Sequence, residues 1–293
     1  LPFHVSTQAS ISNFESAKRF YKMGAQRVIL ARELSLKQIK EIKKKIKKEK
    51  LKLEVECFVH GAMCVSVSGR CFISQQMFKR SANRGDCLQP CRREYVVTDE
   101  EGNKLKVGNN YVLSPKDLCA LPILDKLAAA GINCFKIEGR NRSPEYVKAI
   151  VESYRKAVDK KLSEKEIKGL IKKMKTVYNR DFSTGFYLGT PTADDFTNLY
   201  GSAATHRKEY VGYVKNYYKT PSVAEIKVES SSFKSGESLM FQGNKTGVHE
   251  MKVKSIELNH KKVKEGRKGQ RIAVKTNKVV RENDKVFVIK TSS

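Results

Sequence analysis

The chain has 293 residues, of which 40% are hydrophobic and 30% are charged, so it can bury a core. Its 58 Lys and Arg residues against 31 Asp and Glu residues give a formal net charge of +27, which favours a polyanionic partner, with nucleic acid first. No apolar run approaches the roughly 20 residues of a membrane helix and no secretory leader is visible, so we expect a cytoplasmic protein without a membrane partner. Because the chain begins at Leu1 rather than Met, we expect further residues upstream.

The first 180 residues alternate between strand and helix patterns. Strands are expected at residues 3–6, 27–30, 53–59 and 134–137, and helices at 13–23, 35–46, 116–130, 143–158 and 163–177. A hairpin over residues 95–107 and a short strand at 111–113 interrupt this alternation. Repeated strand–helix units imply an α/β fold with a parallel sheet covered by helices. Only four or five such units are visible where a complete (β/α) barrel needs eight, so the sequence predicts an open sheet or part of a barrel.

The last third of the chain has a different pattern. Residues 181–207 are irregular and rich in Thr, Asp and Gly, which is typical of a connector. Short strands then follow, and they are expected at residues 210–214, 223–228, 238–241, 251–258, 270–274 and 285–289. We therefore expect residues 208–293 to form a small β-barrel or sandwich. It has no Cys and no catalytic cluster, so it is predicted to be a binding or packing module.

Cysteines are concentrated in one segment. Five of the seven, Cys57, Cys64, Cys71, Cys87 and Cys91, fall within 35 residues, and Cys119 and Cys134 follow. Disulfides are rare in the cytosol, and clustered thiolates bind zinc or iron–sulfur clusters. The pairs with two intervening residues that structural zinc usually takes are absent. Spacing alone favours an iron–sulfur cluster but leaves zinc and buried or redox-active thiols open.

Polar side chains follow two of the expected strands. His60 ends the third strand, and Glu138 and Arg140 follow the strand at 134–137. The carboxyl edge of a parallel sheet carries the chemistry in α/β folds, so we assign these three as candidate catalytic residues. His60 suits a proton carrier, or it is satisfied by loop backbone. Glu138 and Arg140 suit an anionic small molecule, or they form a structural ion pair.

Arginines crowd the cysteine segment, which contains Arg70, Arg80, Arg84, Arg92 and Arg93. A guanidinium binds carboxylate or phosphate in bidentate fashion, and it also neutralises an anionic cluster. The common hydrolase motifs are absent from the sequence, because the chain has neither the HExxH motif of zinc proteases nor the GxSxG motif of serine hydrolases. Cys64 near His60 is a weak candidate for a cysteine nucleophile and its base.

Several stretches closely resemble the signature of the collagenase-like peptidase family U-32. These are residues 56–64 (ECFVHGAMC), 68–74 (SGRCFIS), 80–92 (RSANRGDCLQPCR), 116–119 (KDLC) and 136–140 (KIEGR), and residues 5–10 and 27–33 look like the middle region of the family. The resemblance implies a TIM-like (β/α) barrel, of which residues 1–180 are a part truncated at the N-terminus. It also implies that residues 208–293 are a β-barrel similar to the second domain of elongation factor Tu.

The resemblance also implies a chemistry. Family members hydroxylate tRNA wobble uridine or a ribosomal RNA cytidine without oxygen, with prephenate implicated as the hydroxyl donor and a 4Fe-4S cluster held on four cysteines. Carried over by position, the ligands are Cys64, Cys71, Cys87 and Cys119, with Cys91 as the rival fourth, and Cys57 and Cys134 are core residues. Arg70, Arg84 and Arg92 are assigned to the anionic co-substrate.

Three functions remain open at this point. The first is an RNA-modifying enzyme that acts on tRNA or rRNA. The second is a peptidase, as the family name states. The third is an iron–sulfur partner without activity of its own.

Overall fold

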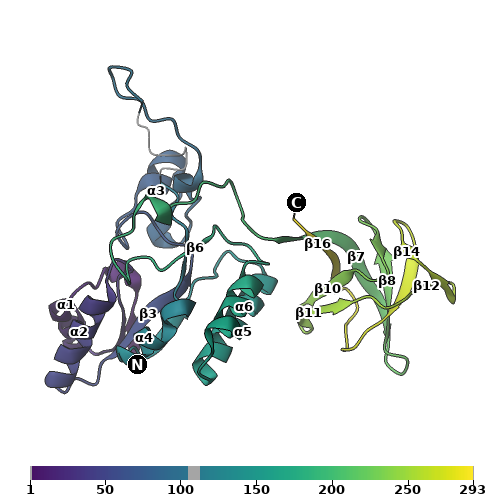
Figure 1. The fold of residues 1–293 in the computed structure, drawn as a ribbon, viewed down its shortest axis with the longest axis horizontal. Coiled ribbons are helices and arrows are strands. Elements are labelled where there is room, and N and C mark those ends of the chain that lie inside the picture. Colours follow the sequence, from purple (N-terminus) through teal and green to yellow (C-terminus); the bar gives the residue numbers. More distant parts are fainter. Residues whose placement is uncertain (1, 105–112, 293) are drawn as a thin grey trace. The chain divides into compact units, whose positions relative to one another are not determined.

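The computed structural model describes residues 2–104 and 113–292. These residues form two compact units (Figure 1). The first comprises Leu1–Arg140 and Ile150–Ala203, and the second comprises Asn141–Ala149 and Ala204–Ser293. Among the described residues, no helix is both long and apolar enough to cross a membrane.

A mostly parallel sheet forms the centre of the first unit. Its strands are β1 (Phe3–Val5), β2 (Ala25–Ile29), β3 (Glu54–Gly61), β4 (Asp117–Cys119), β5 (Cys134–Ile137) and β6 (Phe182–Ser183). β1, β2, β3 and β5 pair in parallel in that order. β4 pairs antiparallel with the last residues of β3, and β6 pairs in parallel with β4. The predicted parallel sheet in an α/β unit is therefore confirmed, whereas its membership of a TIM-like barrel stays a prediction.

Helices alternate with these strands. The α-helices are α1 (Phe14–Lys22), α2 (Leu36–Lys48), α3 (Ile73–Phe78), α4 (Leu124–Ala129), α5 (Pro144–Asp159) and α6 (Glu164–Met174). Short 3-10 turns occur as η1 (Thr7–Ala9), η2 (Ala82–Arg84), η3 (Pro90–Arg92), η4 (Leu121–Ile123) and η5 (Ala193–Asp195). The cysteine segment thus folds as α3, η2 and η3, joined by loops.

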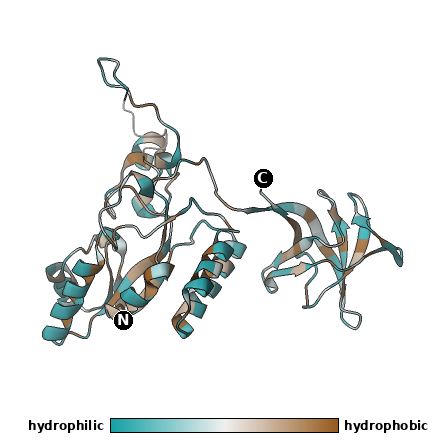
Figure 2. Cartoon of the chain, in the orientation of Figure 1, coloured by the Kyte–Doolittle hydropathy of each residue, from teal (hydrophilic) through white to brown (hydrophobic). Residues whose placement is uncertain are grey.

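The sequence of α2 explains where that helix begins and which face it buries. Ser35 and Gln38 form a capping box, in which each side chain satisfies a backbone N–H that the first helical turn leaves free. Ile39, Ile42 and Ile46 recur at helical spacing and are buried. The remaining surface is mainly Lys and is hydrophilic in Figure 2.

The helix predicted at 116–130 is wrong in its first part. Asp117 and Cys119 lie in β4, and the helix begins only at Leu124. The N–H of Asp117 donates to the carbonyl of Asp181, and the N–H of Ala120 donates to that of Val59. Pairing with strands distant in sequence therefore overrides the local helical pattern.

The predicted hairpin at 95–107 and the strand at 111–113 fall partly outside the described residues, since 105–112 are not described. Within the described part, Thr98 and Lys104 form an isolated antiparallel bridge. Asp99 organises the turn, because its Oδ1 accepts from the N–H groups of Glu101 and Asn103.

The second unit is an antiparallel sheet, as the short strands predicted. Its order is β11-β10-β16-β7-β8-β15-β12-β13. The strands are β7 (His206–Tyr218), β8 (Val223–Val228), β10 (Ser238–Gly243), β11 (Gly247–Lys252), β12 (Ile256–Leu258), β13 (Lys261–Val263), β15 (Arg271–Lys275) and β16 (Lys285–Thr291). β9 (Phe233–Lys234) and β14 (Glu265–Gly266) form a separate pair. The single strand predicted at 251–258 is divided between β11 and β12.

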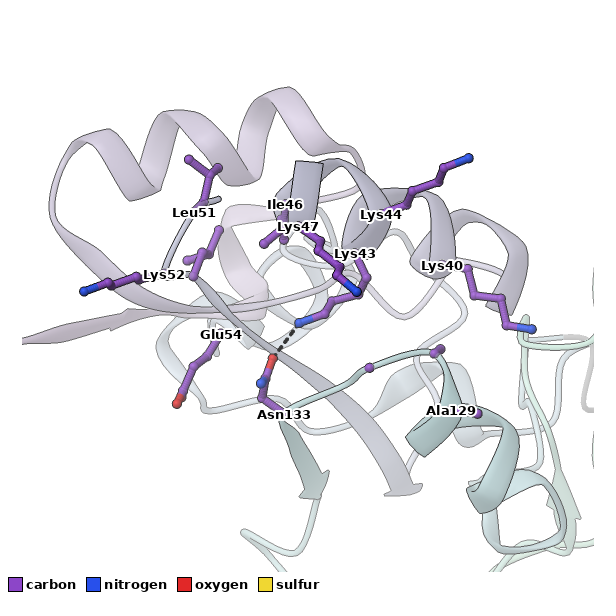
Figure 3. Close-up of a pocket in the computed structure, with 13 residues that line it drawn as sticks. Lys40, Lys43, Lys44, Ile46, Lys47, Leu51, Lys52, Glu54, Ala129 and Asn133 are labelled. Carbon is purple, nitrogen blue, oxygen red and sulfur yellow. Dashed lines mark hydrogen bonds between the residues drawn. The ribbon is translucent and has the colours of Figure 1, made fainter. Parts of the chain in front are cut away.

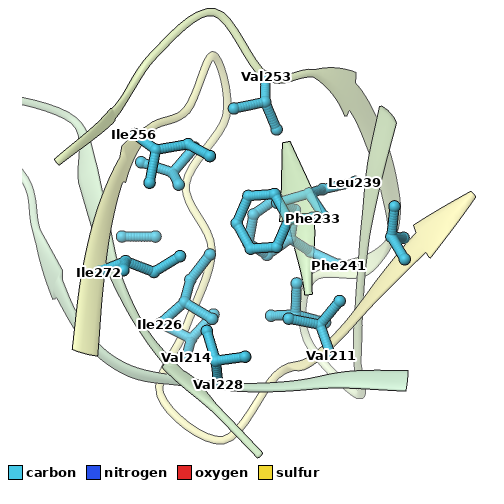
Figure 4. Packing of buried hydrophobic residues seen from close by; sticks show 14 of the residues in the cluster. Val211, Val214, Ile226, Val228, Phe233, Leu239, Phe241, Val253, Ile256 and Ile272 are labelled. Carbon is cyan, nitrogen blue, oxygen red and sulfur yellow. The ribbon is translucent and has the colours of Figure 1, made fainter. Parts of the chain in front are cut away.

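Aliphatic and aromatic side chains fill the interior of this sheet (Figure 4). Phe233 and Phe241 are the largest of them, and Ile226, Leu239 and Ile272 pack in the same cluster. Alternation along each strand produces this core, as in β8, where every second residue is buried.

We predict that Phe241→Ala destabilises the second unit by about 3–5 kcal/mol, because it removes a fully buried ring and leaves a cavity. Hydrogen exchange of strands β7 to β16, measured by mass spectrometry, reports this loss. Val279→Ala is the matched control, since Val279 is 53% exposed. Equal exchange rates in the two variants would contradict the assignment of Phe241 to the core.

Candidate functional site

The carboxyl ends of β3 and β5 bring two of the predicted catalytic residues together. The N–H of Glu138 donates to the carbonyl of His60 at 2.9 Å. Gly61 makes this approach possible: its φ is +116°, and a Cβ there would lie 2.7 Å from the Cβ of Glu138. His60 and Glu138 are therefore neighbours across the sheet edge, as the positions after two parallel strands predict.

The His60 ring lies inside the protein and is 1% exposed. The Tyr154 hydroxyl lies 3.4 Å from its Nδ1 and donates to the carbonyl of Val59 at 2.7 Å. The rings of Tyr154 and Phe182 pack edge-on against the imidazole. Burial raises the pKa of Tyr154 well above its usual value, so this hydroxyl stays protonated.

Cys119 belongs to the same buried cluster. It lies opposite His60 in the β3–β4 pair and is 3% exposed. The Tyr154 hydroxyl approaches its Sγ at 3.8 Å. Burial is the main cause that raises the pKa of Cys119 to about 11, so its thiol is protonated at neutral pH.

The other four predicted ligand candidates gather in the cysteine segment. Cys64 is exposed, and Cys71, Cys87 and Cys91 are half-buried. Burial raises the pKa of Cys91, Arg92 opposes that shift, and the neighbouring Cys64, Cys87 and Cys71 add to it. Among the described residues, no group of three or more Cys, His, Asp or Glu side chains is arranged to hold a metal ion. The thiols are thus close enough to interact electrostatically without forming a preassembled site.

Two arginines hold the loop that carries Cys64. Arg32 Nη1 donates to the carbonyl of Ala62 at 2.8 Å, and Arg92 Nη2 donates to the next carbonyl, that of Met63. The Arg32 guanidinium also lies 4.3 Å from the centre of the Phe58 ring. Burial lowers the pKa of both guanidinium groups, and they remain charged because the shift starts from a very high value.

Arg180 adds positive charge on the Arg92 side. Its Nη2 donates to Gln89 Oε1 at 3.1 Å, and its Nη1 lies 3.7 Å from Asp117 Oδ1. Burial and the neighbouring Arg180 charge together lower the pKa of Arg92. Sequence reasoning missed Arg32 and Arg180. Arg32 lies three residues after the end of β2, which was a usable signal, whereas nothing around Arg180 in the irregular region marked it.

The remaining predicted arginines are on the surface. Arg140 is exposed and lies against Gly85, whose φ is +82° and where a Cβ would be 2.0 Å from Arg140 Nη1. Arg70 is exposed beside Cys71 at a hollow of about 470 Å³. Arg84 is exposed on η2. The structure thus places Arg140 against the cysteine segment and leaves Arg70 and Arg84 exposed on that segment.

Cys57 and Cys134, the two predicted core cysteines, lie on β3 and β5. Cys57 is 2% exposed, and burial is the main cause that raises its pKa to about 12. Cys134 is half-buried. Cys57 is thus a core residue as predicted, whereas Cys134 is only half-buried and does not belong to the core.

The protein therefore belongs to a two-unit structural class. An α/β unit, whose parallel sheet carries thiols and arginines at its carboxyl edge, is followed in sequence by an antiparallel β unit. The family model for peptidase family U32 matches residues 1–197, and the chain belongs to this family. The resemblance seen in the sequence motifs is thereby confirmed.

Three curated relatives illustrate the range of the family. The chain is 43% identical to an uncharacterized protease of Methanocaldococcus jannaschii, over 99% of this chain and 72% of the relative. It is 39% identical to a collagenase of Porphyromonas gingivalis, over 97% of this chain and 71% of the relative. It is 35% identical to a tRNA hydroxylation protein of Bacillus subtilis, over 82% of this chain and 57% of the relative.

We predict that iodoacetamide at about pH 8 alkylates Cys64 in the metal-free protein well before Cys57 or Cys119, because Cys64 is exposed to the reagent. The other two thiols are buried, and burial raises their pKa values to about 12 and about 11, so little of the reactive thiolate forms. Peptide mass mapping over a time course measures the order of labelling. Denatured protein is the control, in which all three should react at similar rates. Early labelling of Cys119 would contradict its burial within β4.

Proposed function

We propose that this protein is an RNA-modifying enzyme that hydroxylates a tRNA wobble uridine without oxygen. The observation that supports this most is the gathering of four thiols and several guanidinium groups at the carboxyl edge of the parallel sheet. A family relative named for tRNA hydroxylation shares 35% identity with the chain. The net charge of +27 suits an RNA substrate. The proposal includes the finer predictions of fold and location: a partial TIM-like barrel, a second unit like that of elongation factor Tu, and action in the cytoplasm.

The proposed cofactor is a 4Fe-4S cluster on Cys64, Cys71, Cys87 and a fourth thiol. The donor set fits in kind and number, since four thiolates usually hold such a cluster. Sequence resemblance favours Cys119 as the fourth ligand, whereas the electrostatic neighbours of Cys91 favour Cys91. When bound, the cluster would supply electron-transfer and Lewis-acid chemistry at this edge.

The residues of the chain itself bind and orient. Arg92 and Arg32 hold the Cys64 loop by its carbonyl groups and keep positive charge beside it. Arg140 lies exposed against the cysteine segment and suits one carboxylate of a dianionic donor such as prephenate, because a guanidinium binds carboxylate in bidentate fashion. Glu138 Oε1 accepts from the N–H of Arg140 at 3.1 Å, which fixes the turn that carries this arginine.

Iron content identifies the ligands. Protein reconstituted anaerobically should contain about four irons per chain, and Ala at Cys64, Cys71 or Cys87 should abolish the cluster, because the loss of one of four ligands leaves an open iron. Comparison of Cys91→Ala with Cys119→Ala decides the fourth ligand, since only the true ligand should lose iron. Cys134→Ala is the control. Zinc in place of iron after anaerobic reconstitution would overturn the cluster.

Mass spectrometry of tRNA tests the reaction. In a strain that lacks the gene, the hydroxylated uridine should disappear, and expression of the wild-type gene should restore it. Arg140→Gln should restore little of the modification while retaining iron, because it removes the positive charge offered to the co-substrate. Arg155→Gln, which removes an exposed arginine on α5 paired with Asp159, should restore it fully. Unchanged tRNA in the deletion strain would refute the proposed function.

A peptidase is the second candidate, because two of the relatives carry protease names. Cys64 and His60 were the cysteine–histidine pair that the sequence suggested for a peptidase. Their placement does not favour a peptidase, since Cys64 is exposed whereas His60 is buried against Tyr154 and Phe182. Cleavage of gelatin by wild-type protein, lost in Cys64→Ala, would establish this candidate. We expect no cleavage.

A further inference from the structure

A lysine-lined groove lies beside α2, where β3 and β5 begin (Figure 3). Its volume is about 820 Å³. One wall is α2, and the rest comes from residues 51–54, which lead into β3, and residues 129–133, which lead into β5. Because both strands begin here and end near His60 and Glu138, the groove marks the amino edge of the sheet. It is separate from the candidate site described above.

Four of its lysines form a single row on α2. Each of Lys40, Lys43, Lys44 and Lys47 has two of the others three or four residues away, so all four lie on one side of the helix. Lys52 adds a fifth ammonium group to the same groove. Like charges at this spacing destabilise a helix by a few tenths of a kcal/mol per pair. The row thus lowers the stability of the free protein.

These lysines lack the carboxylate partners that lysines have elsewhere in the protein. Lys18, Lys168 and Lys173 each lie within 2.7 Å of a Glu carboxylate. In contrast, within residues 2–104 and 113–292, none of the five groove lysines forms an ion pair with Asp or Glu. The one carboxylate that lines the groove, Glu54, is already bound by Arg27 at 2.6 Å. Glu54 acts on Lys43 only at longer range, so the groove lysines that the structure describes have no ion-pair partner of their own.

Specific contacts of Lys43 form the floor of the groove. Lys43 Nζ donates to Asn133 Oδ1 at 2.8 Å, and the same oxygen accepts from the N–H of Val55 at 3.0 Å. Gly131 has a φ of +82°, and a Cβ there would lie 3.2 Å from Lys43 Cε, so glycine lets the lysine stem pack closely. Burial lowers the pKa of Lys43. An anion in the groove would restore that pKa by favouring the charged form.

We propose that this groove binds the sugar–phosphate backbone of the RNA, an inference that rests on the proposed function and adds a second contact surface to it. Lys40 and Lys47 lie about 10 Å apart along the helix axis, which suits successive phosphates rather than one small anion. Lysine acts as a flexible point charge for phosphate. The lining that the structure describes contains no aromatic side chain for base stacking. The groove would therefore recognise the charge of the RNA backbone and not its base sequence.

The test is the salt dependence of tRNA binding by Lys40→Gln, Lys44→Gln and Lys47→Gln combined. Lys43 is kept, because its hydrogen bond supports the floor. The probe is a fluorescein-labelled tRNA transcript, titrated by anisotropy at several KCl concentrations. The slope of log affinity against log salt should become shallower by about 2 to 3, since each lost contact removes about 0.7 to 0.9. Between 50 and 200 mM salt the variant should therefore lose roughly 20- to 40-fold less affinity than the parent.

The matched control combines Lys160→Gln, Lys168→Gln and Lys173→Gln, which changes the net charge equally but removes lysines already paired with Glu166, Glu164 and Glu152. The control should keep the parental slope. The groove variant should melt at or above the parental temperature, because it loses like-charge repulsion.

Three results would overturn the inference: a parental slope in the groove variant, an equal loss in the control, or no tRNA binding at 50 mM salt. Vesicles rich in phosphatidylserine that bind the parent but not the groove variant, with tRNA binding unchanged, would assign the groove to a membrane surface instead. The outcome is distinguishable from that of the proposed function. Groove-dependent tRNA binding without uridine hydroxylation would support the groove proposal and refute the proposed reaction. Uridine hydroxylation with an unchanged salt slope in the groove variant would support the reaction and refute the groove proposal.

Discussion

The pairing of β3 with its neighbours is the constraint on which the first unit depends. β3 pairs with β2 over its first three residues, with β5 from Glu56 to His60, and with β4 at its last two residues. Its carboxyl end is closed by the hydrogen bond from Glu138 to His60, which needs a glycine at position 61. A side chain at Gly61 would separate β5 from β3. The His60 cluster, the Cys64 loop and the turn that carries Arg140 would then lose their common support.

Burial and nearby charge set the environment of each cysteine. Cys57 and Cys119 lie where desolvation raises the pKa of a thiol, so they remain neutral packing residues in the free protein. In the cysteine segment, burial also raises the pKa of Cys64 and Cys91, but Arg92 beside both thiols and Arg32 beside Cys64 oppose that shift. The guanidinium groups also hold the backbone at Ala62 and Met63. One pair of side chains thus sets both the position and the electrostatics of the loop.

Periodic patterns predicted the elements that bury a face of their own. The apolar spacing in α2 and the alternation in β8 were sufficient for those elements, because local residues decide them. β4 was missed because its hydrogen bonds go to Val59 and Asp181, which are distant in sequence. At the site, strand ends predicted that His60 and Glu138 meet, but the burial of Cys119 and the role of Arg180 follow from packing that no local pattern encodes.

The length of β3 sets a distance between the two edges of the sheet. The strand has eight residues, which extend over about 26 Å. A molecule that lies in the groove where β3 begins and reaches the thiols where it ends must span at least that distance. If the groove binds the RNA backbone as proposed, a substrate that contacts both edges at once must therefore extend over about 26 Å, as the arms of a folded RNA do.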